Sequence, residues 1–315
     1  MSYLATAGAA ADPVTQLGWG LIAISCAVVV IVAALLAVAL WRGRVSAAPD
    51  SEGRLPIERT GRGVRWVYAG VAISTVVLFI STVWTLQTLA AIRRPASPAA
   101  FTIEVTGHDW WWEARYVGAV PGQDFTTANE IHVPVGRPVR LELRSADVIH
   151  SFWVPKLAGK TDLIPGRTNV AWIEADHAGS YRGQCGEYCE LEHARMALQV
   201  VADPPERFQA WLADQLAAPA PAASPPIAAG AVVFQARCGA CHTIRGTPAE
   251  GIYGPDLSHF GARATLAAGT APNDPPHLDA WLADPQALKP GAEMPRVPLS
   301  DGDRALVAAY LQSLK

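Results

Sequence analysis

Two long uncharged apolar runs constrain the fold of this chain most strongly. Residues 17–41 and 67–92 contain no Asp, Glu, Lys or Arg. Each run exceeds the ~20 residues that a helix needs to cross the hydrocarbon core of a bilayer. Trp19, Trp41 and Trp66 lie near their ends, as interfacial aromatic residues do. We therefore predict a transmembrane helical hairpin within residues 1–94. The first run is too long for a signal peptide and no Lys or Arg precedes it, so we expect it to be retained.

The loop between the two runs predicts the orientation of the hairpin. Residues 42–65 contain six Arg and three acidic residues. The positive-inside rule therefore places this loop in the cytoplasm and both chain ends on the outer side. The whole chain is 50% hydrophobic with a net charge of −3. This composition indicates a partly membrane-embedded protein and argues against a nucleic-acid partner.

The rest of the chain divides into two further domains joined by a linker. Within residues 95–216, short segments of alternating polarity are typical of strands, at 101–105, 130–133, 138–144 and 169–174. They predict an all-β sandwich or barrel, followed by an amphipathic helix over 205–216. Residues 217–229 form an Ala/Pro/Ser linker. Residues 230–315 have helical spacing, with Ser300 expected to cap the last helix. A helical domain this small suggests that a buried cofactor supplies much of its core.

Residues 185–196 concentrate sulfur and imidazole in one short loop. They include Cys185, Cys189, His193 and Met196. With His150, expected on a neighbouring strand, they make two thiols, two imidazoles and a thioether, a soft set that favours copper. These are too many ligands for one blue-copper ion, and they suit two coppers bridged by two sulfurs. The alternative is a disulfide beside a surface His and a core Met, which we consider the weaker interpretation.

A second cofactor motif is Cys238-Gly-Ala-Cys241-His242, the haem c attachment signature. Cys238 and Cys241 would form thioethers to the haem, and His242 would be its proximal ligand. Met294, the only Met in this region, is the candidate sixth ligand. The alternatives are a thioredoxin-like redox pair or half of a zinc site. Neither has support, because no second C-x-x-C and no βαβ pattern is present.

Residues 15–216 resemble subunit II of the haem-copper cytochrome oxidases. Four motifs carry the resemblance. In chain order they are residues 107–112 (GHDWWW), 147–155 (DVIHSFWVP), 160–167 (KTDLIPGR) and the loop of residues 185–196, the cysteine loop. The resemblance implies a cupredoxin-like Greek-key sandwich with a dinuclear copper centre, CuA, whose side-chain ligands are His150, Cys185, Cys189, His193 and Met196. Glu187 would give its backbone carbonyl to copper, and its carboxylate would bind magnesium or manganese at the contact with subunit I. Trp110 would be the residue through which electrons reach the copper pair.

The fold class expected is thus a multi-domain membrane protein with a transmembrane hairpin, a cupredoxin-like domain and an all-α class I cytochrome c domain at 230–315. The resemblance implies a subunit of cytochrome c oxidase in a bacterial inner membrane, with both cofactor domains on the periplasmic side. Electrons from a cytochrome c or a membrane reductase would pass through haem c and copper to subunit I. Oxygen would be reduced to water there, with proton pumping, and this chain itself has no catalytic residue.

Three other functions compete with this one. A quinol oxidase subunit would lack the copper ligands. A copper-containing nitric oxide reductase-type complex and a membrane-anchored electron shuttle stay open as alternatives. One departure from the family concerns proton uptake, because relatives often have a Glu shortly before the Trp of the second helix. Here residues 61–65 before Trp66 contain none, and Glu58 is not aligned.

Overall fold

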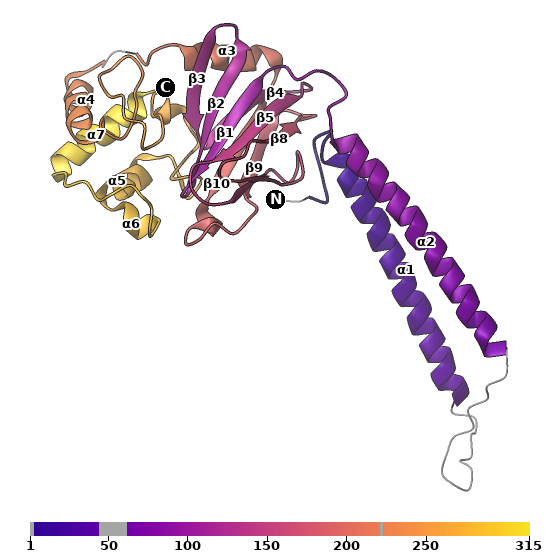
Figure 1. Ribbon diagram of the computed structural model, residues 1–315. Coiled ribbons are helices and arrows are strands. Elements are labelled where there is room, and N and C mark those ends of the chain that lie inside the picture. Colours follow the sequence, from indigo (N-terminus) through magenta and orange to yellow (C-terminus); the bar gives the residue numbers. More distant parts are fainter. Residues whose placement is uncertain (1–2, 44–61, 221–222) are drawn as a thin grey trace. The chain divides into compact units, whose positions relative to one another are not determined.

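The computed structural model describes residues 3–43, 62–220 and 223–315, which form two compact units (Figure 1). One unit, residues 13–93, contains two helices, α1 (Asp12–Gly43) and α2 (Arg62–Ile92). Only Asp12, the first residue of α1, is assigned to the other unit. Both helices are long and apolar enough to cross a membrane, and their large apolar side chains are mostly exposed. The two predicted apolar helices are confirmed. α1 extends beyond 17–41 at both ends, whereas α2 begins before residue 67 and ends at Ile92 as predicted. Residues 44–61 of the predicted cytoplasmic loop, with Glu58, lie outside the described residues.

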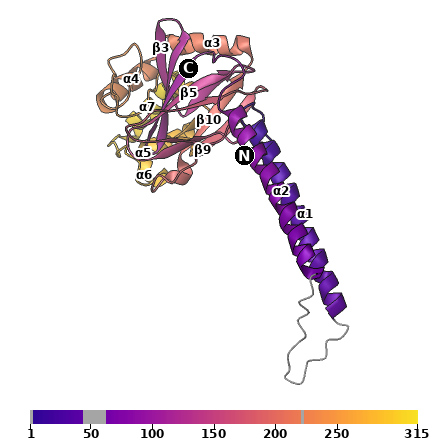
Figure 2. The ribbon, with the colours of Figure 1, turned by 45° about the vertical axis from the view of Figure 1, so that its right-hand side comes forward.

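The second unit begins with a sandwich of two five-stranded sheets (Figures 1 and 2). The strand order is β3-β2-β1-β5-β8 in one sheet and β4-β10-β9-β6-β7 in the other. The strands are β1 (Thr102–His108), β2 (Trp111–Val120), β3 (Gln123–Ala128), β4 (Glu130–Pro134), β5 (Val139–Ser145), β6 (His150–Trp153), β7 (Thr161–Leu163), β8 (Asn169–Ile173), β9 (Gly179–Cys185) and β10 (Ala197–Asp203). Pairing is antiparallel except for β1 with β5 and β4 with β10. Of the two architectures predicted, the sandwich is the one observed.

Strict alternation of side chains builds the sandwich core. In β1, Ile103 and Val105 are fully buried between the sheets, whereas Glu104 points to the other face. Helix α3 (Pro205–Leu216), confirmed with its predicted bounds, closes one part of this core. Its Phe208 ring stacks on Phe101 with ring centroids 5.5 Å apart. Apolar burial of this kind contributes about 1.5–3 kcal/mol per large side chain, which is sufficient to hold a short helix.

The segment that precedes α1 also belongs to the sandwich unit, which the sequence did not reveal. The backbone N–H of Ala7 donates to Lys156 O at 2.9 Å, and Ala7 O accepts from the N–H of Asp176, also at 2.9 Å. A side chain at Gly8 would collide with the backbone of Glu174 and Leu157. These contacts hold residues 7 and 8 against the sandwich.

The C-terminal domain is helical, with α4 (Pro225–Arg237), α5 (Pro275–Ala283), α6 (Pro285–Leu288) and α7 (Asp301–Ser313). Ser300 caps α7 by accepting from the N–H of Asp303 at 3.1 Å, as predicted. The predicted linker, 217–229, differs from the structure because residues 225–229 are already helical. Pro225 and Pro226 occupy the first turn of α4, where a missing N–H costs nothing.

Candidate functional site

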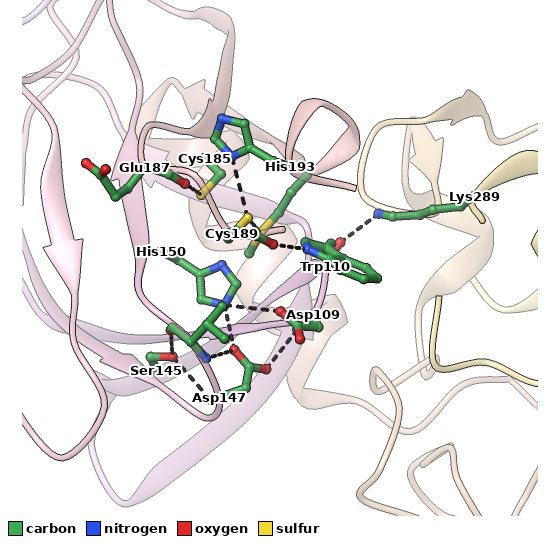
Figure 3. A network of polar contacts seen from close by, with 12 residues as sticks. Asp109, Trp110, Ser145, Asp147, His150, Cys185, Glu187, Cys189, His193 and Lys289 are labelled. Carbon is green, nitrogen blue, oxygen red and sulfur yellow. Dashed lines mark hydrogen bonds and ion pairs between the residues drawn. The ribbon is translucent and has the colours of Figure 1, made fainter. Parts of the chain in front are cut away.

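The cysteine loop joins β9 to β10 and places its sulfur atoms beside β6 (Figure 3). Cys185 ends β9 and pairs with Phe152 of β6, two residues after His150. The ligand atoms of His150, Cys185 and Cys189 all lie within 4.8 Å of one another. Cys189 Sγ lies 3.5 Å from His193 Nδ1 and 3.8 Å from Met196 Sδ. The five side chains predicted as copper ligands thus gather in one place.

Glu187 lies in the same loop, and its two kinds of oxygen have different partners. Its backbone carbonyl lies 3.1 Å from Cys185 Sγ, as a carbonyl ligand at this centre would require. Its carboxylate forms an ion pair with Lys160 at 2.7 Å. Across residues 3–43, 62–220 and 223–315, neither cluster of potential metal ligands includes Glu187. The magnesium or manganese site at this carboxylate stays a prediction.

Both cysteines of the loop are buried and free, so the thiols are available to metal. The hydrogen bond between the two thiols shifts their pKa values in opposite directions. The neighbouring Cys189 thiol holds the pKa of Cys185 far below its ordinary value, at about 3. The Cys185 thiolate in turn raises the pKa of Cys189 well above its ordinary value. Without metal, a single negative charge is therefore shared by the pair, and bound metal would be needed to deprotonate the second thiol.

The imidazole of His150 is oriented by a carboxylate behind it. Nε2 lies 2.7 Å from Asp147 Oδ1, while the buried Nδ1 has no hydrogen-bond partner. Asp147 is itself held by the backbone N–H groups of Asp109 at 2.8 Å and Val148 at 2.7 Å. Metal-ligating histidines commonly donate their second N–H to a carboxylate in this way. The orphaned Nδ1 beside two thiols fits a copper ligand.

The carboxylates around His150 shift one another's charge state. Burial lowers the pKa of His150, but its contacts with Asp147 and with the Cys185 sulfur together outweigh burial and raise this pKa to about 9. Burial would raise the pKa of Asp147, but the hydrogen bonds it accepts from His150, Val148 and Asp109 together with the His150 charge lower it. Asp109 is different, because burial and the nearby Asp147 charge raise its pKa to about 6. Without metal, His150 and Asp147 therefore form a charged pair at 2.7 Å, and Asp109 lies farther from the ring, at 3.8 Å.

Gly107 makes room for the His150 ring, which suggests a direct test. A Cβ at this position would lie 2.7 Å from His150 Cδ2. We expect Gly107→Ala to displace the ring and to weaken copper binding about 10–100-fold, as loss of an outer contact to a metal ligand does. Copper titration of the full chain measures the effect. Gly159→Ala is the control because a Cβ there meets nothing within 4 Å, and equal copper affinity in both variants would contradict this role of Gly107.

The haem c motif opens into a cavity of about 390 Å³ in the C-terminal domain. Helix α4 leads directly into Cys238, whose N–H donates to Phe234 O. The side chains of all four residues predicted to hold haem line the cavity, namely Cys238, Cys241, His242 and Met294. Met294 is distant from the motif in the sequence. It reaches the same cavity because the segment after α6 packs on the core of this domain.

Three details of this cavity fit a haem. His242 Nδ1 lies 2.9 Å from Pro255 O, which leaves Nε2 for an iron. A Cβ at Gly254 would lie 2.5 Å from His242 Cε1, so only glycine allows the ring this position. Arg263 lines the cavity with a buried Nε that has no partner, which suits an anionic group such as a haem propionate.

Trp110 lies between the two candidate centres. Its indole Nε1 donates a hydrogen bond to the backbone carbonyl of Cys189 (Figure 3). Trp110, with its neighbours Asp109 and Trp111, also lines the cavity that holds the haem motif. Trp111 also stacks on His108, with ring centroids 4.2 Å apart. Trp110 therefore contacts the cysteine loop and also forms part of the wall of the haem cavity.

Sequence reasoning missed three residues that shape these sites. Asp147 lies three residues before His150, so a search for the second partner of a ligating histidine would have found it. Gly107 lies in the motif at 107–112, but no role was predicted for it or for Lys289, because what these two residues contact comes from distant parts of the chain.

Two family descriptions match the outer part of this chain. Residues 118–203 match the family "Cytochrome C oxidase subunit II, periplasmic domain", and residues 227–315 match "Cytochrome c". The first match contains all six residues predicted at the copper centre, and the second contains all four predicted at the haem. Trp110 lies outside both. A subunit II domain implies copper and a cytochrome c domain implies haem.

Curated relatives cover more of the chain. "Cytochrome c oxidase subunit 2" of Alkalihalophilus pseudofirmus is 39% identical over 215 residues, which is 68% of this chain and 61% of that protein. The protein of the same description from Bacillus sp. (strain PS3) is 30% identical over 259 residues, or 77% of this chain and 71% of that one. Among solved structures, the periplasmic domain of subunit II of cytochrome oxidase of Bradyrhizobium japonicum is similar, with 31% identity and a TM-score of 0.36. That match covers 38% of this chain and 96% of that domain.

Fold and site together define a chain with two apolar helices that could span a membrane, a cupredoxin-like sandwich and a cytochrome c domain. The chain belongs to the cytochrome c oxidase subunit 2 family.

Proposed function

We propose that this chain is the electron-input subunit of a respiratory terminal oxidase. Electrons from a cytochrome c donor would pass through haem c to a dinuclear copper centre and on to subunit I, where oxygen is reduced to water with proton pumping. Haem c and a copper pair supply one-electron chemistry when bound. The observation that carries the proposal is the position of Trp110, in contact with the cysteine loop and at the wall of the haem cavity.

The residues of the chain would hold and orient these groups. His150, Cys185, Cys189, His193, Met196 and the Glu187 carbonyl would hold copper, and Cys238, Cys241, His242 and Met294 would hold haem. Asp147 orients the His150 ring and Pro255 O orients that of His242. Because the hydrogen-bond partners of both rings belong to the protein, neither ring needs to rotate when an electron arrives. A site whose ligands move little when its charge changes is suited to passing electrons on.

We also propose that the two apolar helices cross the inner membrane of a bacterium, with both outer domains on the periplasmic side. The apolar side chains exposed along α1 and α2 and the six Arg between the two apolar runs support this orientation. Subunit I and other oxidase subunits, together with lipid, would cover these helices. The electron donor would be a cytochrome c or a membrane reductase.

Replacing Trp110 with Phe tests the proposed route. We expect electron transfer from haem to copper to slow several-fold, because Phe cannot donate to the Cys189 carbonyl and the larger indole ring is lost. Rapid mixing of the purified complex with reduced cytochrome c, followed at the haem and copper absorption bands, measures this rate. Trp211→Phe is the matched control, since Trp211 of α3 stacks on His132 and is not among the residues that line the haem cavity. Equal rates in the two variants would refute the route through Trp110.

A further inference from the structure

A buried lysine connects the domain with the haem motif (residues 230–315, the haem domain) to the domain with the cysteine loop (residues 95–216, the copper domain). Lys289 follows α6 and is only 3% exposed. Its Nζ donates to the backbone carbonyl oxygens of Trp110 at 2.7 Å, Arg195 at 2.9 Å and Ala267 at 3.2 Å, and Figure 3 shows the first of these contacts. An ammonium group has three N–H donors. All three are therefore used, two of them on carbonyls of the copper domain.

The lysine is held by carbonyl groups and not by a counterion. Within the described ranges 3–43, 62–220 and 223–315, no carboxylate lies at ion-pair distance from Lys289. Glu192, the acidic group that most affects it, pairs with Arg195 at 3.2 Å. Burying an ammonium without a counterion is costly unless its donors are fully satisfied. Here that satisfaction depends on the two domains being in contact. Burial lowers the pKa of Lys289 to about 8, so the group stays protonated at neutral pH.

Two glycines bring the backbone of the haem domain close to the copper domain. A Cβ at Gly269 would lie 2.9 Å from Ala197 Cβ, and one at Gly291 would lie 2.8 Å from Leu191 Cδ2. Both glycines have positive φ, at 74° and 84°. Leu191 and Ala197 belong to the cysteine loop and the start of β10. The surfaces thus fit closely on both sides of the lysine.

Two further hydrogen bonds, each donated by a backbone N–H group, connect the two domains. The N–H of Ala197 donates to Ala268 O at 2.9 Å, and the N–H of Ala264 donates to the Glu130 carboxylate at 3.0 Å. Buried polar groups require such partners when water is excluded. The helices of the haem domain accordingly lie beside the sandwich in both ribbon views (Figures 1 and 2).

We propose that Lys289 is a positioning residue that fixes the haem domain on the cysteine loop, so that Trp110 remains a wall of the haem cavity. The domain then works as a docked unit and does not move between separate contacts. This inference deepens the proposed function, on which its purpose rests. Docking itself can be measured without electron transfer, so the two proposals can fail separately.

The test compares Lys289→Met with Lys315→Met in the full chain carrying copper and haem. Met keeps an unbranched side chain of similar length but leaves the carbonyls of Trp110 and Arg195 without their ammonium donor. Lys315 is exposed at the end of the same domain, so its variant removes the same charge. Hydrogen exchange is measured in residues 264–270 and 289–292, which form the contact, and in β2 and α7 as internal references.

We expect exchange in the two contact segments to rise about tenfold in Lys289→Met, which corresponds to about 1.4 kcal/mol of lost docking free energy. Exchange in β2 and α7, the haem spectrum and the copper signal should stay unchanged, and Lys315→Met should match the parent protein. Contact segments that exchange at the parental rate in Lys289→Met would overturn the proposal. So would an equal rise in Lys315→Met.

A second measurement uses the unmodified protein and so covers the case in which Lys289→Met does not fold. Mild acetylation should label Lys315 at least about tenfold faster than Lys289, because a docked contact must open before Lys289 reacts. The ratio should disappear in denaturant. Labelling of both lysines at the same rate in the native chain would show that the contact is open, and the proposal would be wrong.

Discussion

Replacing Cys185 with Ser is expected to abolish binding of the copper pair and to leave the haem spectrum intact. A hydroxyl of nearly the same size can fill the buried position at the end of β9, but it does not ionise to a bridging ligand at neutral pH. The site would also lose the more acidic thiol of the pair. Metal analysis and electron paramagnetic resonance measure the result. The parent should show one unpaired electron shared by two coppers, and the variant should lack this signal.

Cys26→Ser is the matched control, because Cys26 is a free, exposed thiol within the first apolar helix. It should bind copper as the parent does. Parental copper content in Cys185→Ser would contradict the assignment of the cysteine loop. Simultaneous loss of the haem signal would contradict the independence of the two centres.

Replacing Met294 with Leu is expected to leave haem covalently attached but without its sixth ligand. Cys238, Cys241 and His242 would still hold the group, so the haem content should not change. The spectrum should change from low-spin to high-spin, and the midpoint potential should fall, because axial ligands set haem potentials over a range of about 0.8 V. Optical spectra and a redox titration of the full chain measure both effects.

Met196→Leu provides the reciprocal control in the other domain. Met196 is fully buried beside Cys189. Its replacement should alter the copper signal and leave the haem spectrum low-spin. If Met294→Leu keeps a low-spin haem with an unchanged potential, another side chain supplies the sixth ligand.

Local patterns in the sequence were sufficient for much of the architecture. The two apolar runs, the alternation in β1 and the capping of α7 by Ser300 each depend on residues close together in the chain. The interpretation of 217–229 as linker was less accurate at its end, because prolines that are common in linkers are equally suited to the first turn of α4.

The two candidate centres differ in how far the sequence could describe them. Cys185, Cys189, His193 and Met196 fall within one loop, so their proximity follows from the chain itself. His150, which the sequence predicts on a neighbouring strand, joins them through the pairing of β6 with β9. The fit around the ring, with Asp147 behind it and Gly107 against it, required the positions of two segments that are distant in the sequence.

The chemical groups at both centres can be predicted from the amino-acid sequence, because the thiols, imidazoles and thioethers occur in short motifs whose spacing limits their possible partners. The position of the two centres relative to each other depends on long-range packing. Lys289 and Trp110 are 179 residues apart, and no local pattern indicates that the ammonium of one meets the carbonyl of the other. Such a contact exists only where two folded surfaces fit, since the free energy of burying the ammonium depends on acceptors that both domains supply.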